Sequence, residues 1–209
     1  MSIAKRKERQ RAELRERILQ AARQIVNGEG LEQLTIRKIA ELIDYAPGTI
    51  YLHFEGRHDI VRQLVRESFG ELLRYMSRAA RLVDPLERLR ALGHAYIAFA
   101  MEHPAAYRTI FMQPPDIAAA VWSLVKEDGE GRKGPGQGAF AILWSTVREL
   151  IDRGVFRKLD AEVVADAIWA CVHGIVALHI SCPQQKLADA DASADLIVEG
   201  MVRMFAPAS

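Results

Sequence analysis

The sequence predicts an all-α protein: an amino-terminal three-helix helix-turn-helix domain, joined by a shared fourth helix to a larger helical domain. Three observations support this prediction. Apolar residues recur at three- and four-residue spacing along nearly the whole chain. Val, Ile and Thr never cluster with the period-two alternation of a strand. Half of the 209 residues are hydrophobic, which is enough for a buried core.

The first helices are expected to be short and to form one unit over residues 8–56. An apolar stripe predicts a helix from about Glu8 to Asn27, ended by the glycines that follow. Thr35 is expected to cap a short second helix that ends near Ile43. A third helix is expected over 47–54, so that the helix-turn-helix motif spans 34–54.

The connecting helix is expected over 57–80, and the larger domain over 81–209. Asp84 followed by Pro85 predicts the start of a further helix, and His103-Pro104 its end. Asp160 is expected to cap a later helix. The helices expected in this domain cover 85–102, 105–112, 115–128, 139–153, 160–180 and 193–205, with a Gly-rich flexible loop at 129–138.

Charge and cysteine usage narrow the classes of protein. Residues 1–57 hold 11 Lys and Arg against 8 Asp and Glu, whereas the remainder holds 17 against 19. A basic amino-terminal end suggests a polyanion partner, although a solvated helix face explains the same charges. No stretch reaches the roughly 18 apolar residues of a membrane helix. Two cysteines without CxxC spacing favour a reducing cytoplasm over a disulfide scaffold.

A helix-turn-helix motif places a short helix in the major groove of DNA. This segment has the residue types that such a placement requires. Asp44 occupies the turn, where a residue that tolerates the left-handed region is needed. Pro47 suits the first turn of a helix, and Gly48 lets the backbone approach bases. Hydroxyl, imidazole and guanidinium groups supply donors to phosphates and base edges. The residues expected to face DNA are Thr35, Arg37, Tyr45, Pro47, Gly48, Thr49, Tyr51, His53 and Arg57.

The segment from about Arg11 to Gly70 resembles the DNA-binding domain of the tetracycline-repressor (TetR) family. The matching stretches are ILQAARQIVNGEG, LTIRKIAE and GTIYLHF followed by Arg57. The resemblance implies an all-helical homodimer with a carboxy-terminal ligand-binding domain, and it places Arg57 at the family's phosphate-binding lysine. This sequence departs from the family pattern at Asp44, which replaces the turn glycine, at Ala46, which removes the capping Ser or Thr, and at Pro47, which offers no base-reading side chain.

The carboxy-terminal half resembles the WHG-type domain of some TetR regulators, through Trp169, His173-Gly174 and the segment HPAAYRTIF at 103–111. The resemblance implies a pocket for a small, largely apolar effector. Aromatic residues at helical spacing are more often core than ligand contacts, and for His173 a satisfied core histidine is favoured slightly over a ligand contact. The candidate effector contacts are Tyr96, Phe99, Phe111, Met112, Trp122, Trp144, Trp169 and His173.

Two helices, near 139–153 and 160–180, are apolar on more than one face and must be buried. A homodimer that pairs these hairpins would bury them, and its dyad suits a palindromic double-stranded DNA operator. The favoured function is a ligand-responsive transcriptional regulator, a repressor rather than an activator. The alternative is a helical adaptor that binds only protein and no DNA.

Other classes receive little support from the sequence. No enzyme is expected, because the sequence shows no phosphate loop, nucleophile elbow or converging acid pair. No cofactor, metal or membrane partner is expected either. A metal site is conceivable from Cys171, His173, His179 and Cys182, but their spacing matches no zinc pattern.

Overall fold

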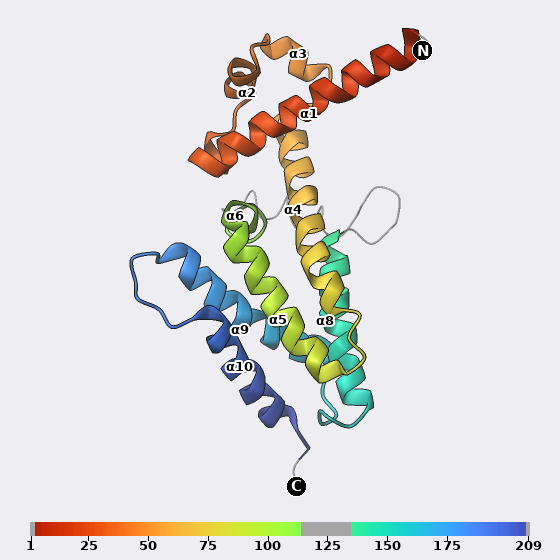
Figure 1. The fold of residues 1–209 in the computed structure, drawn as a ribbon, viewed down its shortest axis with the longest axis vertical. Helices are drawn as coiled ribbons and strands as arrows, with labels where there is room; N and C mark the ends of the chain where they lie inside the picture. Colours follow the sequence, from red (N-terminus) through yellow and green to blue (C-terminus); the bar gives the residue numbers. More distant parts are fainter. Residues whose placement is uncertain (1–2, 114–134, 208–209) are drawn as a thin grey trace.

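The structure is a computed structural model that describes residues 3–113 and 135–207, and all regular structure within these residues is helical. The long first helix and the two short helices that follow it gather at one end of an elongated molecule and form an amino-terminal unit (Figure 1). These elements are α1 (Ile3–Glu29), a 3₁₀ turn η1 (Leu31–Gln33), α2 (Ile36–Ile43) and α3 (Pro47–Tyr51).

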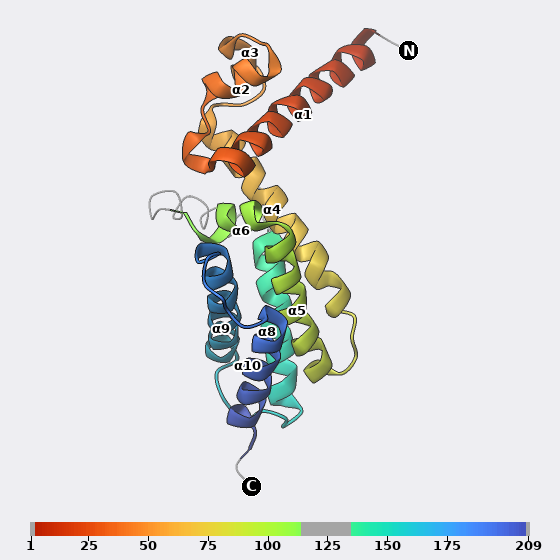
Figure 2. The same ribbon diagram turned by 60° about the vertical axis from the view of Figure 1, so that its left-hand side comes forward.

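The long helices form a bundle at the other end. Helix α4 leaves the amino-terminal unit and runs along α5 and α8, while α9 and α10 pack beside one another on the far side (Figure 2). These elements are α4 (Arg57–Ala79), α5 (Pro85–Glu102), α6 (Pro104–Phe111), α8 (Pro135–Asp152), α9 (Ala161–Ser181) and α10 (Ala190–Phe205). The all-α fold predicted from sequence is therefore confirmed.

Helix α4 belongs to both parts of the molecule. Its first half buries Ile60 and Leu64 in the core of the amino-terminal unit, and its second half buries Leu72 and Met76 in the bundle. One continuous hydrophobic cluster therefore extends from α1 through α4 to α9. A second cluster joins α8, α9 and α10 around buried Leu150. Each fully buried aliphatic side chain contributes about 1.5–3 kcal/mol.

Capping residues set several helix starts as predicted. The Thr35 hydroxyl accepts the Lys38 N–H (3.1 Å), and the Asp84 carboxylate accepts the Leu86 N–H (2.9 Å). A side-chain cap of this kind is worth about 1 kcal/mol. Asp160 caps α9 in the same way.

Four helix boundaries differ from the prediction. Helix α1 begins at Ile3 because residues 3–8 are good helix formers with no breaker among them. Helix α3 ends at Tyr51, three residues early, in a turn closed by bonds to the Ile50 carbonyl. Helix α8 starts at Pro135, inside the predicted loop, since Pro is tolerated in the first turn of a helix. Helix α10 starts at Ala190 because Asp189 caps it.

Three predictions lie outside the described residues. They are the helix expected over 115–128, the candidate effector contact Trp122 within it, and the greater part of the loop at 129–138.

The outer surface of the bundle is apolar on α9 and α10 rather than on α8. Helix α8 buries Leu143, Val147 and Leu150 within the protomer. In contrast, Val163 and Leu178 of α9 are 64% and 54% exposed, and Leu196 and Met204 of α10 are 72% and 56% exposed. In length and composition α9 also resembles a bilayer-spanning helix, although its other face is packed into the bundle core.

A histidine clamp joins α5 to the start of α10. His94 Nδ1 lies 2.8 Å from Asp191, and Nε2 lies 2.8 Å from Asp195. Both ring nitrogens can donate to carboxylates only when the imidazole is protonated. Hydrogen bonding to Asp191 raises the pKa of His94, burial opposes it, and Asp195 raises it further.

We expect this clamp to make folding stability depend on pH. A raised folded-state pKa means that the stabilisation is fully present below the ordinary histidine pKa of about 6.5 and is lost as the pH rises through the folded-state value. His94→Gln should therefore lower Tm by about 1–3 °C near pH 5.5 and by less near pH 9. Thermal melts at both pH values check this, and an equal Tm difference at the two would contradict it.

Candidate DNA-binding surface and effector cavity

The turn between α2 and α3 holds the two helices at a fixed angle. Asp44 lies in the left-handed region (φ 61°, ψ 51°), as predicted, and the Tyr45 N–H donates to the Ala40 carbonyl (3.0 Å). This conformation costs an L-residue about 1–2 kcal/mol, and Asp tolerates it better than most. Ala46 makes no side-chain cap, and Pro47 occupies the first turn of α3, which agrees with the sequence analysis.

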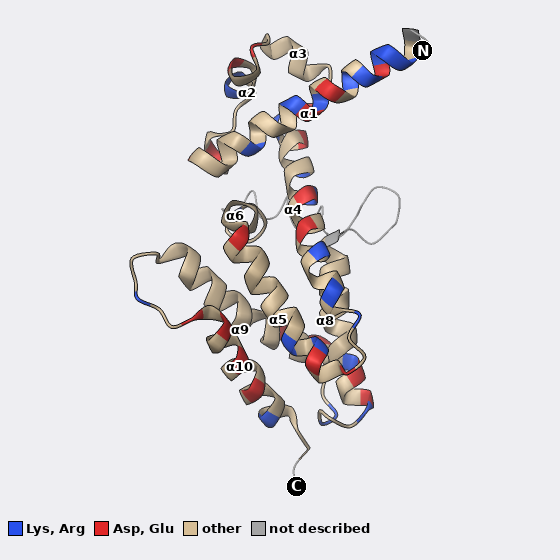
Figure 3. Cartoon of the chain, viewed as in Figure 1, with Lys and Arg blue, Asp and Glu red and all other residues tan. Residues whose placement is uncertain are grey.

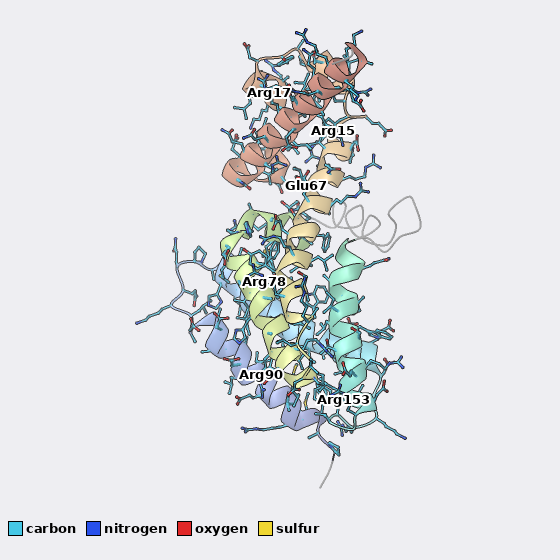
Figure 4. The ribbon with its side chains drawn as sticks, turned by 45° about the vertical axis from the view of Figure 1, so that its right-hand side comes forward. Arg15, Arg17, Glu67, Arg78, Arg90 and Arg153 are labelled. Atoms are coloured by element: carbon cyan, nitrogen blue, oxygen red, sulfur yellow. The ribbon has the colours of Figure 1, made fainter. Side chains whose placement is uncertain are left out.

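Two arginines of α1 hold the carboxyl ends of α2 and α3 (Figure 4). Arg15 Nη1 donates to the His53 carbonyl (3.0 Å), and its guanidinium lies 4.1 Å from the Phe54 ring centroid. Arg17 Nη2 donates to the Ile43 carbonyl (3.2 Å). A cation at the end of a helix satisfies its last carbonyls and complements its dipole. Sequence reasoning missed both roles, because the partners lie 38 and 26 residues away.

Arg57 anchors the start of α4 to η1 and to the residue that follows it. Its Nε donates to the Leu34 carbonyl (2.8 Å) and its Nη2 donates to the Leu31 carbonyl (3.0 Å). These two bonds use two of the five N–H donors of a guanidinium. The phosphate contact expected of Arg57 stays a prediction, and it would use the remaining donors.

The outer face of α3 and its preceding turn is open to solvent. Tyr45, Tyr51 and Leu52 are 41%, 58% and 71% exposed, and a group of exposed apolar residues at one place marks a candidate binding surface. Pro47 and Gly48 are also exposed, whereas Thr49 and His53 are half-buried.

Helix α2 contributes Thr35 and Arg37 to the same end of the molecule. The Thr35 hydroxyl is engaged in capping α2, although it can still donate its own proton. Arg37 is exposed and pairs with Glu41 (2.8 Å). A surface pair of this kind is worth less than about 1 kcal/mol, so Arg37 can exchange Glu41 for another anion at little cost.

A cavity of about 640 Å³ lies in the bundle between α4, α5, α6, α8 and α9. Its volume is in the range of sites for drug-sized ligands. Two exposed carboxylates, Glu162 and Asp166, border it on α9. Most of its wall is apolar, and its aromatic members are Phe69, Tyr96, Phe111, Phe140, Trp144 and Trp169.

Four of the candidate effector contacts line this cavity: Tyr96, Phe111, Trp144 and Trp169. Three others do not line it. Phe99 is fully buried on the core side of α5, Met112 packs against the main hydrophobic cluster beyond the end of α6, and His173 lies behind Tyr96. Sequence periodicity could not separate these positions, because both core and cavity face the interior of the bundle. Phe69 and Phe140 were missed for the same reason.

His173 anchors a buried polar network behind the cavity wall. Its Nδ1 lies 2.9 Å from the Tyr96 hydroxyl and 2.7 Å from the Tyr107 hydroxyl, and Trp169 Nε1 lies 3.4 Å from the Tyr96 hydroxyl. Burial lowers the pKa of His173 and raises the pKa of Tyr107 to about 12. The network is therefore uncharged at neutral pH, and His173 is a hydrogen-bonded interior histidine.

Metal-binding groups do not converge in the described ranges, 3–113 and 135–207, where no cluster of three His, Cys, Asp or Glu side chains could hold an ion. Cys171 and Cys182 are free thiols. The ring nitrogens of His179 lie 2.8 Å from the Ile175 carbonyl and 3.0 Å from the Ala188 carbonyl.

The cavity wall is mechanically connected to the amino-terminal unit. Phe111 of α6 packs edge-on against Phe69 of α4 (ring centroids 5.9 Å apart), and both line the cavity. Arg23 of α1 forms an ion pair with Glu67 of α4 (2.7 Å). Helix α4 therefore contacts both the cavity wall and α1.

Comparison with protein families gives two matches that together cover most of the chain. The model described as "Tetracyclin repressor-like, C-terminal domain" matches residues 89–201. The model described as "Bacterial regulatory proteins, tetR family" matches residues 18–64, which include α2, α3 and the start of α4.

Individual relatives are more distant. The transcriptional repressor KstR2 of Mycolicibacterium smegmatis is 31% identical over 103 residues, which are 49% of this chain and 50% of that protein. The chain thus spans about half the length of the first curated relatives that it matches.

Solved structures share the fold over nearly the whole chain. A Rhodococcus sp. RHA1 protein of unknown function has a TM-score of 0.76 at 22% identity, covering 93% of this chain and 96% of that one. Bacillus subtilis FadR in complex with stearoyl-CoA has a TM-score of 0.70 at 20% identity, covering 90% and 97%.

Proposed function

The chain belongs to the tetracycline-repressor family of transcriptional regulators, and from this premise we propose that it binds a palindromic operator as a homodimer and represses transcription until a small apolar effector releases it. Its relatives are regulators rather than enzymes. Repression is favoured over activation because a bound dimer simply obstructs polymerase. Such a regulator acts in the cytoplasm.

The observation that supports this proposal is a helix-turn-helix that arginine side chains hold in place and whose outer face is exposed to solvent. Arg15 and Arg17 bind carbonyls at the carboxyl ends of α3 and α2, and Arg57 binds carbonyls of the segment before α2, so the surface that would contact DNA is held in place by the scaffold. Tyr45 and Tyr51 then project outward, with Gly48 between them allowing close approach of the backbone. Because Pro47 offers no polar side chain, sequence readout would depend on Arg37, on Tyr45 and on DNA shape.

The exposed apolar residues favour a dimer interface on α9 and α10. Val163, Ala170, Gly174 and Leu178 recur along one face of α9, and the small residues among them permit close helix packing. The sequence places the interface on the helices at 139–153 and 160–180, which correspond to α8 and α9. The proposed interface keeps α9 but has α10 in place of α8, because α8 buries its apolar side chains inside the protomer. Two such helix pairs would form a four-helix bundle.

The cavity is proposed to hold the effector. Its aromatic and aliphatic wall suits a lipophilic molecule, and the FadR structure with stearoyl-CoA makes acyl thioesters one class to test first. An occupant that pushes Phe111 and Phe69 apart would shift α6 and α4. Since α4 starts at the DNA-binding unit, this shift would change the spacing of the two recognition helices in the dimer.

The DNA-binding proposal is tested with Arg37→Ala combined with Tyr51→Ala. An operator selected from random duplexes with the wild-type protein should lose at least tenfold in affinity, because each such contact is worth about 1–3 kcal/mol. Arg78→Ala, at the far end of α4 (Figure 4), is the control and should bind normally. If no duplex binds the wild-type protein at low salt, the chain is the protein-binding adaptor instead.

The proposed interface is tested with Ala170→Glu, which would bury an unpaired carboxylate between two copies of α9. Light scattering should show a dimer for the wild type and a monomer for the variant. Val83→Glu changes an exposed apolar residue in the loop after α4 and should remain dimeric. A dimeric Ala170→Glu protein would refute the placement on α9.

The effector site is tested by filling the cavity. Ala141 lines it, and Ala141→Trp should reduce the Tm shift produced by any acyl thioester, aromatic acid or lipophilic drug that stabilises the wild type, since the shift grows with ligand occupancy. Ser145→Trp, exposed one turn further along α8, should leave the shift intact. Equal shifts in the wild type and Ala141→Trp would place the ligand elsewhere.

A further inference from the structure

One face of α1 is buried in the core near the middle of the helix and becomes exposed toward the amino terminus, beyond the end of α3. Residues spaced by three and four lie on one face of a helix, and Lys7, Gln10, Arg11, Leu14 and Ile18 are spaced in this way. Ile18 is fully buried, Leu14 is half-buried, and the three polar residues are exposed. The amino-terminal half of α1 therefore projects as a helical arm beside the recognition helix, and Lys and Arg are dense along it (Figure 3).

An open groove of about 520 Å³ separates this arm from the end of α3. Gln10, Arg11 and Leu14 line it from α1, and Leu52 and His53 line it from the residues that follow α3. Leu52 directly follows the outward-facing Tyr51. The groove is thus continuous with the surface proposed to enter the major groove.

The polar groups at this groove are donors that lack acceptors. Within the described residues, neither Lys7 nor Arg11 forms an ion pair. His53 Nδ1 is buried, and it has no hydrogen-bond partner in the part of the chain that the structure describes. A buried polar atom in this state costs free energy, and His53 Nδ1 is too enclosed for an anion in the groove to contact it directly.

The charge at the groove also favours an anion. Burial lowers the pKa of His53, and Arg11 and Arg15 lower it further, because neighbouring positive charges disfavour a third one. Arg15 already has the His53 carbonyl as a partner. A phosphate in the groove would offset this repulsion, would supply acceptors to Arg11, and would favour protonation of the His53 imidazole.

We propose that this groove is a clamp for the DNA backbone, in which Gln10 and Arg11, with Lys7 one turn away on the same face of α1, hold phosphates of the strand that borders the recognition helix. The inference rests on the proposed operator binding and extends it to a second contact element. In helix-turn-helix proteins, contacts to phosphates fix the register of the recognition helix without reading bases. The clamp would therefore strengthen binding to every duplex, whatever its sequence.

The test is the salt dependence of affinity for a random-sequence duplex of about 30 base pairs, followed by fluorescence anisotropy. Removing one side chain that neutralises a phosphate lowers the slope of log K against log salt by about 0.9. Lys7→Gln combined with Arg11→Gln should reduce the slope by about 2 for each protomer bound and should weaken binding at least fivefold near 0.1 M salt.

The control is Arg78→Gln combined with Arg81→Gln, which removes the same charge at the far end of α4. This variant should keep the slope of the wild type. Thermal melts should show that both double variants fold, because none of the four side chains is buried. A Lys7/Arg11 variant with the slope of the wild type would overturn the clamp.

The outcome also separates this inference from the operator proposal. If the wild-type protein binds no duplex, the proposed function itself fails. If it binds duplexes and the Arg37/Tyr51 variant loses the operator while the Lys7/Arg11 variant binds with an unchanged slope, only the clamp fails. NMR of His53 adds a direct readout, because its imidazole pKa should rise when the duplex is bound.

Discussion

The shared core of α4 is the constraint on which the rest of the structure depends. Ile60 and Leu64 are buried against the helix-turn-helix, and Leu72 and Met76 are buried in the bundle. Between them, Phe69 forms part of the cavity wall. Because close-packed interiors do not deform continuously, α4 is the element through which a change around Phe69 would reach the helix-turn-helix under the proposed function.

The second constraint is the set of arginines around α2 and α3. A recognition helix of five residues has too few internal hydrogen bonds to be stable alone. Arg15 holds its carboxyl end, Arg17 holds the end of α2, and Arg57 holds the loop before α2. Cations that charge alone would assign to DNA thus stabilise the scaffold, whereas Lys7 and Arg11 form no ion pair within the described residues and Arg37 pairs only with Glu41 on the surface.

Some aromatic residues of the bundle pack in its core, and others line the cavity. Phe99 and Tyr107 are fully buried, whereas Tyr96 and Trp169 lie between the core and the cavity. The His173 network fixes Tyr96 in place without adding a charge. The cavity therefore has a broad apolar wall that is supported from behind by an uncharged network, an arrangement that suits a lipophilic occupant.

Local chemistry in the sequence was enough to predict most of the helices, several of their caps, and the turn between α2 and α3. Thr35, Asp44, Pro47, Asp84 and Asp160 act within a few residues of themselves, and their roles were predicted correctly. Contacts between distant segments were decided only by the tertiary structure. Periodicity shows that a side chain faces the interior of the bundle. Whether the space next to it is filled or is part of the cavity depends on side chains from other helices. This is why Tyr96 and Phe99, three residues apart on the same helix, could be separated into a cavity wall and a core position only after the bundle was assembled.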